Sequence, residues 1–500
     1  MNPPSTLARL EAIVDAAAIA PTLEALLPTG GRPRQLPVRT LFVGMLLAVA
    51  DDRPAHLVRI HDALVSLDPT QRRRLGVEVD WRTGPHLLTY RQVERTFSLV
   101  EDALAADAPH GQPSQRLCTI VDALMEASIP AQHRQNSTAL AVDWTDLETW
   151  ARPPLSSGAT SADPDASWGH RRGHAPGAEH ERFFGYYPQA ATMVGEEHGP
   201  PVPELARRLL VTSCHIDPAR AFVGVFERMA AAGIPLGDVL ADSGYAHRTA
   251  DGWALPLRRL GARLIQDLHP HDRGPKGTHG GAIAANGRLW CPATPQALLA
   301  LGPLPAHADP EAIAVHDLQT GELARYKLVR HSADDPDGYH RVACPALAGK
   351  LRCPLRPESM SLPHDRPEIL APPTSAPHRC CTQQTLTVPP EVNAKTVQKH
   401  DYPNAAWRRS YARRTGAERT FSTVKDPATT DIHRGWCRLM GLTPITLFLA
   451  CAMVVRNQRI LDAYHARQTD NARRLAAGLP PRTRRRRRRT LADLTAPTPA

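Results

Sequence analysis

The sequence has few cysteines and no pattern that would cross-link them. Its 500 residues contain nine cysteines, an odd number, with no C-x-x-C pair. The start of the chain lacks the basic segment and continuous apolar run of a secretory leader, so a disulfide framework is not expected. No apolar run reaches the ~20 residues of a membrane-spanning helix, and the most apolar stretch, residues 445–455, is expected to form a buried helix. These absences favour a cytoplasmic protein.

Aromatic residues are also scarce, at 5% of the chain, while 48 prolines indicate many loops. An apolar content of 42% is nevertheless enough for real hydrophobic cores, and the length suggests two or three domains. The formal charge of +10 and the isoelectric point of about 9.3 favour a polyanionic partner, with nucleic acid first among the candidates.

Residues 411–425, YARRTGAERTFSTVK, carry an unusual set of side chains. If this stretch is one helix, Tyr411, Arg414, Glu418 and Lys425 fall within roughly 60° of one another around its axis, and Trp407 joins the same stripe. Such a polar and chemically varied face suits a phosphate-rich ligand beside a metal ion. The alternative is a solvated ion pair between Arg414 and Glu418, which would contribute only about 0.3–0.5 kcal/mol.

Two aspartates each end a short apolar run that predicts a strand. Asp143 closes residues 140–143 and Asp242 closes residues 239–242. Burial of a lone carboxylate costs several kcal/mol unless the group is paired or binds a metal, so both are candidate ligands. We interpret three neighbouring acids as structural: Asp146, Asp238 and Asp267.

The predicted elements follow a recognisable order. Three strands are expected at residues 140–144, 182–193 and 209–216, followed by a helix that begins at Asp217-Pro218. A strand at 239–242, a helix and a strand at 263–268 complete the series. This is the order of an RNase H-like fold, in which the first and fourth strands are neighbours, so Asp143 and Asp242 would meet.

The spacing Y-x2-R-x3-E-x6-K, together with these two aspartates, resembles the YREK signature of bacterial insertion-sequence DDE transposases. All four signature positions match, and the resemblance covers residues 140–457. It implies an α/β fold: an RNase H-like mixed five-stranded sheet flanked by helices, with an N-terminal helical domain and a β-rich insertion before the catalytic helix. Activity would be Mg²⁺-dependent DNA cleavage at the element ends and strand transfer, through a hairpin intermediate and in a homodimer on DNA.

The resemblance also assigns roles to residues. Asp143, Asp242 and Glu418 would be the catalytic acids and would hold two Mg²⁺ or Mn²⁺ ions, to which hard oxygen ligands are suited. Four side chains would contact DNA: Tyr411, Arg414, Lys425 and Trp407. A flipped base would stack on an aromatic ring, for which Trp144, Tyr245 and Trp407 are the candidates.

Five segments are expected. Residues 1–130 form a helical domain that contacts DNA, or that only caps the core. Residues 138–268 and 401–470 form the two parts of the catalytic core. Residues 269–400 form the β-rich insertion, since the stretch between Asp242 and Glu418 is far too long for a loop. Residues 471–500 form a disordered basic tail with six arginines at 484–489, which would bind DNA backbone or only improve solubility.

Several weaker patterns favour structural explanations. Residues 90–98 echo the later ERTFS motif but lack its spacing, so Glu94 is interpreted as structural. The Gly-, Ser- and His-rich residues 153–179 predict a solvated loop, although His170 and His174 could bind a metal. Five insertion cysteines could hold structural zinc, but free thiols are favoured because no C-x-x-C pair is present: Cys291, Cys344, Cys353, Cys380 and Cys381.

Two other functions remain open at this point. A metal-dependent nuclease or resolvase on the same fold would cut DNA without joining it. An inactive DNA-binding remnant would do neither, although the full set of acids and YREK residues argues against it.

Overall fold

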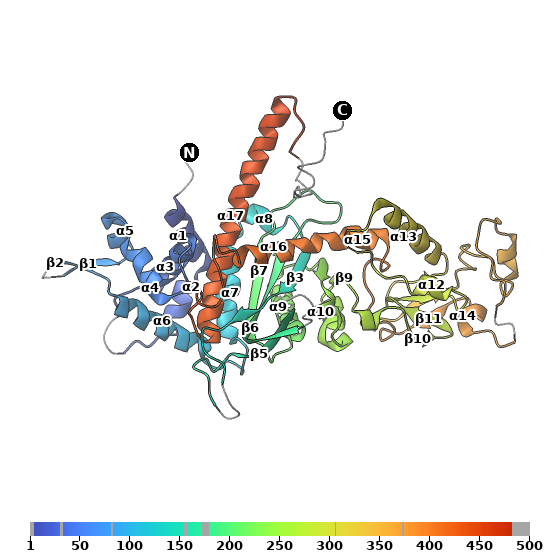
Figure 1. Cartoon of the computed structure of the whole chain (residues 1–500), viewed down its shortest axis with the longest axis horizontal. Coiled ribbons are helices and arrows are strands. Elements are labelled where there is room, and N and C mark those ends of the chain that lie inside the picture. The colour runs from blue at the N-terminus through green and yellow to red at the C-terminus, as the bar shows by residue number, and fades with distance from the viewer. Residues whose placement is uncertain are drawn as a thin grey trace.

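The computed structural model describes residues 5–482 except for residues 31–33, 82–83, 155–158, 173–179, 306 and 373–374. The predicted arginine run at 484–489 and His174 lie outside the described residues. The molecule is elongated, with N-terminal helices at one end, a mixed sheet in the middle and the insertion at the other end (Figure 1).

The central sheet is mixed and has seven strands in the described part of the chain. They are β3 (Leu140–Trp144), β4 (Leu147–Glu148), β5 (Ser167–Arg172), β6 (His180–Met193), β7 (Ala206–Ser213), β8 (Asp238–Ala241) and β9 (Arg263–Gln266). β6 lies antiparallel between β7 and β3, while β3, β8 and β9 are parallel to one another. The five predicted strands are therefore confirmed. The C-terminal ends of β3, β8 and β9 lie at the same edge of the sheet, because these three strands are parallel.

The prediction of only five strands is wrong because β4 and β5 also pair with the long strand β6. β5 falls within the stretch that we predicted to be a loop. Contacts across the strands stabilise it. The ring centroids of Trp168 and Phe184 are 5.6 Å apart. The Tyr187 hydroxyl accepts a hydrogen bond from the His170 amide at 2.9 Å and donates one to the His170 carbonyl at 2.8 Å. Its sequence, SWGHRR, has little intrinsic preference for a strand, so tertiary pairing decides its structure.

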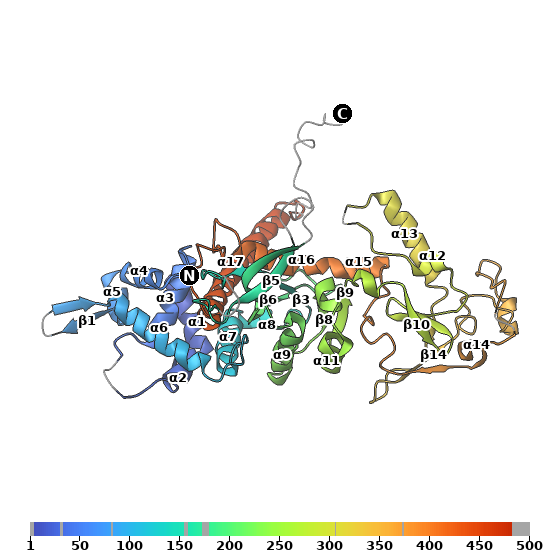
Figure 2. The ribbon, with the colours of Figure 1, turned by 60° about the horizontal axis from the view of Figure 1, so that its bottom comes forward.

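Helices cover both faces of the sheet (Figure 2). On one face lie α9 (Pro218–Ala231) and α11 (Leu255–Arg259), with a π-helical turn at Ala250–Ala254, and they bury Phe222, Phe226 and Trp253. As predicted, Asp217 caps α9 by accepting hydrogen bonds from the first-turn amides. The short helix α10 (Ser243–Ala246) follows β8 directly.

The predicted continuous helix over residues 411–425 is interrupted. α15 (Ala405–Tyr411) ends in a 3-10 turn at Ala412–Arg414, and α16 (Thr415–Val424) then crosses the second face of the sheet. Two side chains bind carbonyls three residues back: Arg413 Nε donates to Ser410 at 3.0 Å and the Thr415 hydroxyl donates to Ala412 at 3.1 Å. Such local bonds compete with the α-helical pattern and tighten this turn.

The predicted N-terminal helices are present, together with a hairpin that we did not predict. They are α1 (Thr6–Ala17), α2 (Ile19–Glu24), α3 (Val38–Ala50), α4 (Leu57–Val65), α5 (Pro69–Arg74), α6 (Tyr90–Ala105), α7 (Gln115–Ala127) and α8 (Ala131–Arg134), with the hairpin β1 (Glu78–Trp81) and β2 (Gly84–Leu87). Of these helices, α1 to α4, α6 and α7 share one hydrophobic cluster with α16, α17 and part of the sheet, so they do not form a separate core.

The long helix α17 (Leu442–Ala476) includes the predicted buried helix and packs on β7, α3 and α7. Its first half is buried, and the second half projects from the body of the molecule (Figure 1). The helix runs past residue 471, where we placed the start of the tail, and ends near Gly478, whose φ of 70° suits a helix terminus. Across the described residues, no helix combines the length and apolar character needed to cross a membrane.

The insertion contains two small antiparallel sheets. One comprises β10 (Pro275–His279), β11 (Ala282–Ala285) and β12 (Arg288–Trp290), and the other β13 (Val329–Arg330), β14 (His340–Ala343) and β15 (Leu386–Val388). Asn286 and Gly287 join β11 to β12 with φ values of 49° and 78°, as a type I′ hairpin requires. The insertion also contains helices α12 (Gln296–Leu299), α13 (Pro310–Leu323) and α14 (Arg379–Thr382), of which we had predicted none.

Candidate active site

Two of the predicted acids lie at the same edge of the sheet. Asp143 is near the end of β3, and Asp242 directly follows β8. The two strands are parallel neighbours, with Leu140 beside Val239 and Ala141 beside Leu240. The strand order therefore brings together two carboxylates that lie about a hundred residues apart in the sequence.

Helix α16 carries the third acid over this edge. Glu418 lies in the first turn of α16, which contacts β3 and β6. The hydroxyls of Thr420 and Thr192 are 2.9 Å apart and join the helix to β6. A Cβ atom on Gly416 would lie only 2.6 Å from Val194 Cγ1, so the close approach of helix and sheet depends on glycine at this position.

Arg414 connects two of the acids. Its Nη2 lies 2.5 Å from Glu418 Oε1, and its Nη1 lies 3.7 Å from Asp143 Oδ1. The side chain is largely buried, and its Nη1 atom has no hydrogen-bond partner among the described residues. The guanidinium thus places one positive charge between carboxylates from two distant segments of the chain.

Asp143 has the most strongly perturbed carboxyl group at this edge. Its pKa is raised to about 7: burial is the largest cause, the charges of Asp242 and Glu418 act in the same direction, and Arg414 opposes the shift. The backbone amide of Trp144 donates to Asp143 Oδ1 at 3.0 Å. A raised pKa from both burial and like charges is typical of a site that concentrates negative charge for a function.

Asp242 is held by the start of the following helix. Its Oδ1 accepts hydrogen bonds from the amides of Gly244 at 2.9 Å and Tyr245 at 3.4 Å. Trp144 lies against the same turn, since a Cβ atom on Gly244 would meet its ring at 2.5 Å, and the rings of Trp144 and Tyr245 are 4.4 Å apart. Trp144 and Tyr245 therefore support the loop that positions Asp242.

The acids could supply oxygen ligands to a divalent ion, as predicted from the sequence, but they are not gathered into a compact ligand cluster. Among the described residues, the one group of three potential ligands within 4.8 Å of one another is His247, His269 and Asp272. Glu418 is instead turned toward Arg414, and about half of its side chain is exposed. The three acids fit a hard cation, because they offer carboxylate oxygens as ligands. The negative charges of Asp242 and Glu418 also raise the pKa of Asp143.

Trp407, which we predicted to contact DNA, is buried in the core, which argues against a direct contact. Trp407 is 3% exposed, its indole donates to the Gln266 carbonyl at 3.2 Å, and its ring stacks on Tyr411 with centroids 4.8 Å apart. Tyr245 is fully buried as well, which leaves Trp144 as the partly exposed aromatic candidate of the three. Apolar residues surround the indole of Trp407, so burial outweighs the stripe position that suggested a contact.

Tyr411 and Arg414 remain adjacent, whereas Lys425 lies elsewhere. The Arg414 guanidinium is 5.8 Å from the centre of the Tyr411 ring, and burial raises the pKa of the Tyr411 hydroxyl. Lys425 follows the far end of α16 and pairs with Asp146 at 2.8 Å. Asp146 also contacts Arg171 at 3.1 Å. Arg171 belongs to β5, in the stretch that we had predicted to be a loop.

The acids that we interpreted as structural have cationic or hydroxyl partners. Asp238 is fully buried at the opposite edge of the sheet and pairs with Arg263, Lys399 and Arg413. Asp267 accepts a hydrogen bond from the Tyr402 hydroxyl at 2.8 Å and pairs with Arg273 at 3.3 Å. These partners account for the charge of both groups.

The five insertion cysteines are all buried, and no three of the described ones have sulfur atoms close enough to share an ion. The sulfurs of the adjacent Cys380 and Cys381 are 3.8 Å apart. In the His247, His269 and Asp272 group, the carboxylate already pairs with Lys395 at 2.7 Å. Burial accounts for the raised pKa of the Cys291 thiol, about 12, and keeps it protonated.

Comparison with protein-family models and with curated proteins finds no match to this chain.

Proposed function

We propose that the protein is a DNA transposase of the DDE class, which cuts DNA at the ends of a mobile element and transfers the cut strand to a target. The observation that carries this proposal is the convergence of Asp143, Asp242 and Glu418, from three distant segments, on the surroundings of one buried arginine. A structural ion pair needs one acid for Arg414, whereas three acids at one sheet edge suit a metal-dependent phosphoryl transfer.

The topology of the sheet supports an RNase H-like core. Its central strands follow the order β7-β6-β3-β8-β9, with β6 antiparallel to its neighbours and β3, β8 and β9 parallel. Acids at the ends of the first and fourth of these strands in chain order, and on a helix across the sheet, are what the resemblance to YREK transposases leads us to expect. The insertion between Asp242 and Glu418 agrees with the same resemblance.

Asp143, Asp242 and Glu418 would hold Mg²⁺ or Mn²⁺. Two such ions, when bound, polarise a phosphate and favour ionisation of the attacking water or 3′-hydroxyl. The chain's own contribution is positional: the amides of Gly244 and Tyr245 fix Asp242, and the contact of Gly416 with Val194 fixes the depth of α16. Arg414 compensates the carboxylates until DNA and metal are present.

Other side chains at this edge would hold the DNA. Arg414 can fork onto a phosphate, and Tyr411 beneath it can donate its hydroxyl, because burial keeps that hydroxyl protonated. Trp144 is the aromatic candidate for stacking on a displaced base. Lys425 would have to leave Asp146 before it could meet a phosphate. We propose that a homodimer performs the reaction, with each copy acting on one DNA end.

The test is cleavage of labelled duplexes that carry the inverted repeats flanking the coding region. The full chain is expected to cut them with Mg²⁺, and Asp143→Asn, Asp242→Asn and Glu418→Gln are each expected to abolish cutting while DNA binding remains. Asp68→Asn is the matched control, because asparagine also caps a helix and Asp68 lies at the start of α5, among the N-terminal helices at one end of the molecule (Figure 1). Cleavage that survives in any one of the three acid variants would refute the metal role of that acid.

A nuclease or resolvase on the same fold is distinguished by the fate of the cut end. A transposase joins the 3′-hydroxyl to a second DNA molecule, so a labelled end should appear in products longer than the substrate. A nuclease or resolvase gives cut ends without these products. An inactive remnant would bind the duplex without cutting it at all.

A further inference from the structure

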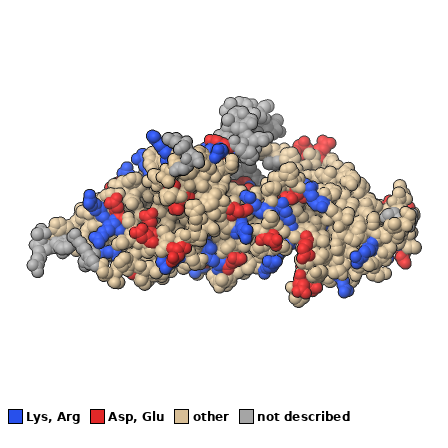
Figure 3. Space-filling view, turned by 90° about the horizontal axis from the view of Figure 1, so that it is seen from below, with Lys and Arg blue, Asp and Glu red and all other residues tan. Residues whose placement is uncertain are grey.

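A second concentration of charge lies outside the candidate active site. On the face of the molecule drawn in Figure 3, basic and acidic side chains are interspersed, so that face has no extended basic patch. Between the sheet and the insertion, however, a cavity of about 770 Å³ is lined by seven lysines and arginines and a single acid, Asp334. We call it the cationic cleft.

The cationic cleft lies at the edge of the sheet opposite the catalytic acids. Arg263, in its lining, is the first residue of β9 and pairs in register with Asp238, the first residue of β8. Asp242 follows the other end of β8. Since β3, β8 and β9 are parallel, a ligand in this cleft would be separated from Asp143 and Asp242 by the length of the strands.

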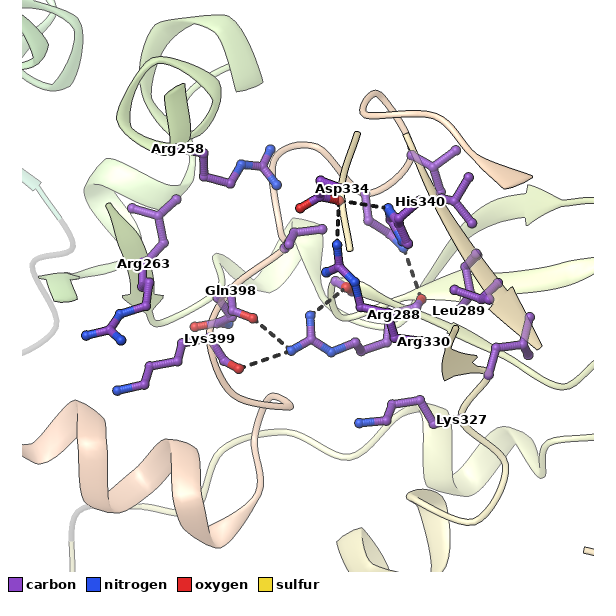
Figure 4. Close-up of a pocket in the computed structure, with 18 of the residues that line it drawn as sticks. Arg258, Arg263, Arg288, Leu289, Lys327, Arg330, Asp334, His340, Gln398 and Lys399 are labelled. Carbon is purple, nitrogen blue, oxygen red and sulfur yellow. Dashed lines mark hydrogen bonds and ion pairs between the residues drawn. The ribbon is translucent and has the colours of Figure 1, made fainter. Parts of the chain in front are cut away.

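The cations come from both walls of the cleft (Figure 4). Arg258, Arg263 and Lys399 belong to α11, β9 and the segment before α15, on the side of the sheet. The insertion supplies the other four: Arg288, Lys327, Arg330 and Lys350. They surround the cavity rather than meeting at one point, which suits an extended polyanion better than a single phosphate group.

Nearby acids do not neutralise this charge. Arg263 and Lys399 pair with Asp238, and Lys399 also with Glu197. Arg288 and Lys327 share the single acid Asp401. With Asp334 beside Arg330, four carboxylates face seven cations, which leaves an excess of three positive charges.

Two cations in the lining have no carboxylate within 4 Å among the described residues. Arg258 donates only to the backbone carbonyl of Ala394, and Lys350 has no ion pair at all. Burial lowers the pKa of both side chains, and Lys327 lowers the pKa of Lys350 further. Asp334 and Asp401 act on these two cations only at longer range and do not offset the effect of burial. Half-buried cations without a paired carboxylate are costly, so their presence points to an anion that arrives from outside the chain.

We propose that the cationic cleft binds a stretch of phosphodiester backbone of DNA, at a site separate from the catalytic acids. The choice of DNA as the polyanion rests on the proposed function. None of the described lining residues is Phe, Tyr or Trp, and the imidazole of His340 pairs with Asp334 at 3.3 Å, so the cleft offers no large aromatic ring on which a base or a free nucleotide would stack. The cleft would therefore hold DNA without sequence preference and by charge, away from the end being cut.

The test compares two double variants of the full chain by fluorescence anisotropy with a labelled duplex of arbitrary sequence. Arg258→Gln with Lys350→Gln removes the two unpaired cations of the cleft. Lys276→Gln with Arg467→Gln removes the same charge from exposed positions that do not line it. The cleft variant is expected to bind about tenfold more weakly, with a salt dependence reduced by about 0.9 for each lost phosphate contact. The control variant should change by less than about twofold, because isolated exposed charges are screened.

Equal losses in the two variants, or an unchanged salt dependence in the cleft variant, would overturn the proposal. Competition separates the possible ligands: excess unlabelled duplex should displace the labelled duplex, whereas displacement by ATP at equimolar phosphate would mean that a small phosphate compound occupies the cleft. Asp143→Asn serves as the independent check on the proposed function. If it leaves cleavage intact while the cleft variant loses affinity, the transposase mechanism fails and the DNA-binding cleft stands.

Discussion

The guanidinium of Arg414 lies between Asp143 and Glu418, 3.7 Å from a carboxylate oxygen of Asp143 and 2.5 Å from one of Glu418. Asp143 belongs to the first central strand and Glu418 to a helix almost three hundred residues later in the chain. A cation in this position stabilises acids that would otherwise repel one another, and a divalent ion could perform the same task.

Asp143→Asn is expected to raise the thermal stability of the metal-free protein above neutral pH. The pKa of Asp143 is about 7 in the folded chain, against an ordinary value of 3.8, so folding is opposed increasingly as the pH rises from about 4 to 7. The cost levels off above pH 7 at up to about 4 kcal/mol. Scanning fluorimetry should show the melting temperature of the variant exceeding that of the wild type by a few degrees at pH 8 and by less at pH 5.

Mg²⁺ supplies the control for this prediction. Bound metal would stabilise the ionised carboxylate, so the wild type should gain more from added Mg²⁺ or Mn²⁺ than Asp143→Asn does. Equal gains in the two proteins would contradict a metal-binding role for Asp143.

Arg414→Gln is expected to make stability fall more steeply with pH. Without the guanidinium, the pKa of Asp143 would rise further, because only Arg414 opposes the effects of burial and of Asp242 and Glu418 among the neighbouring side chains. The variant should therefore lose more free energy of unfolding between pH 5 and pH 8 than the wild type, by about 1–3 kcal/mol. Urea unfolding at the two pH values measures this difference. Arg414→Lys keeps the charge, so a slope as steep as that of Arg414→Gln in this variant would rule out the electrostatic explanation.

Trp407, which is buried, and Trp144, which is partly exposed, should respond differently to substitution. Trp407→Ala is expected to cost about 3–5 kcal/mol of stability, because the ring is 3% exposed and fills the core. Trp144→Ala should cost less, since its ring is partly exposed, but should impair cleavage of DNA ends if the ring stacks on a base. Unfolding curves and cleavage rates per folded molecule separate the two effects. If Trp144→Ala cleaves DNA normally, Trp144 does not stack on a base. None of the three aromatic candidates would then remain, because Tyr245 and Trp407 are buried.

The sequence predicted the sheet well because its central strands have strong local signals. The run Leu140, Ala141 and Val142 is fully buried, and the observed strand begins and ends as expected. β5 was missed because its residues are polar and acquire a strand conformation only beside β6. Asp143 and Asp242 were found through their positions at strand ends, and Glu418 through the spacing of the side chains in residues 411–425. The burial of Trp407 and the pairing of Lys425 with Asp146 depend on contacts between distant segments, which helical spacing cannot encode.

The contact between Gly416 and Val194 sets the height of α16 above the sheet. Gly416→Ala would place a Cβ atom 2.6 Å from Val194 Cγ1, a branched side chain with little freedom to move aside. The better helix propensity of alanine is worth about 1 kcal/mol, but overpacking costs about 1–3 kcal/mol, so a net loss of stability is expected. The shift of α16 would also displace Glu418, which lies two residues further along the same helix turn. Val194→Ala removes the clashing methyl groups, so the double variant should regain both stability and metal-dependent cleavage relative to Gly416→Ala alone. Measured as a double-mutant cycle by urea unfolding, the coupling between the two positions should be about 1 kcal/mol or more, and purely additive effects would mean that this contact does not position the helix.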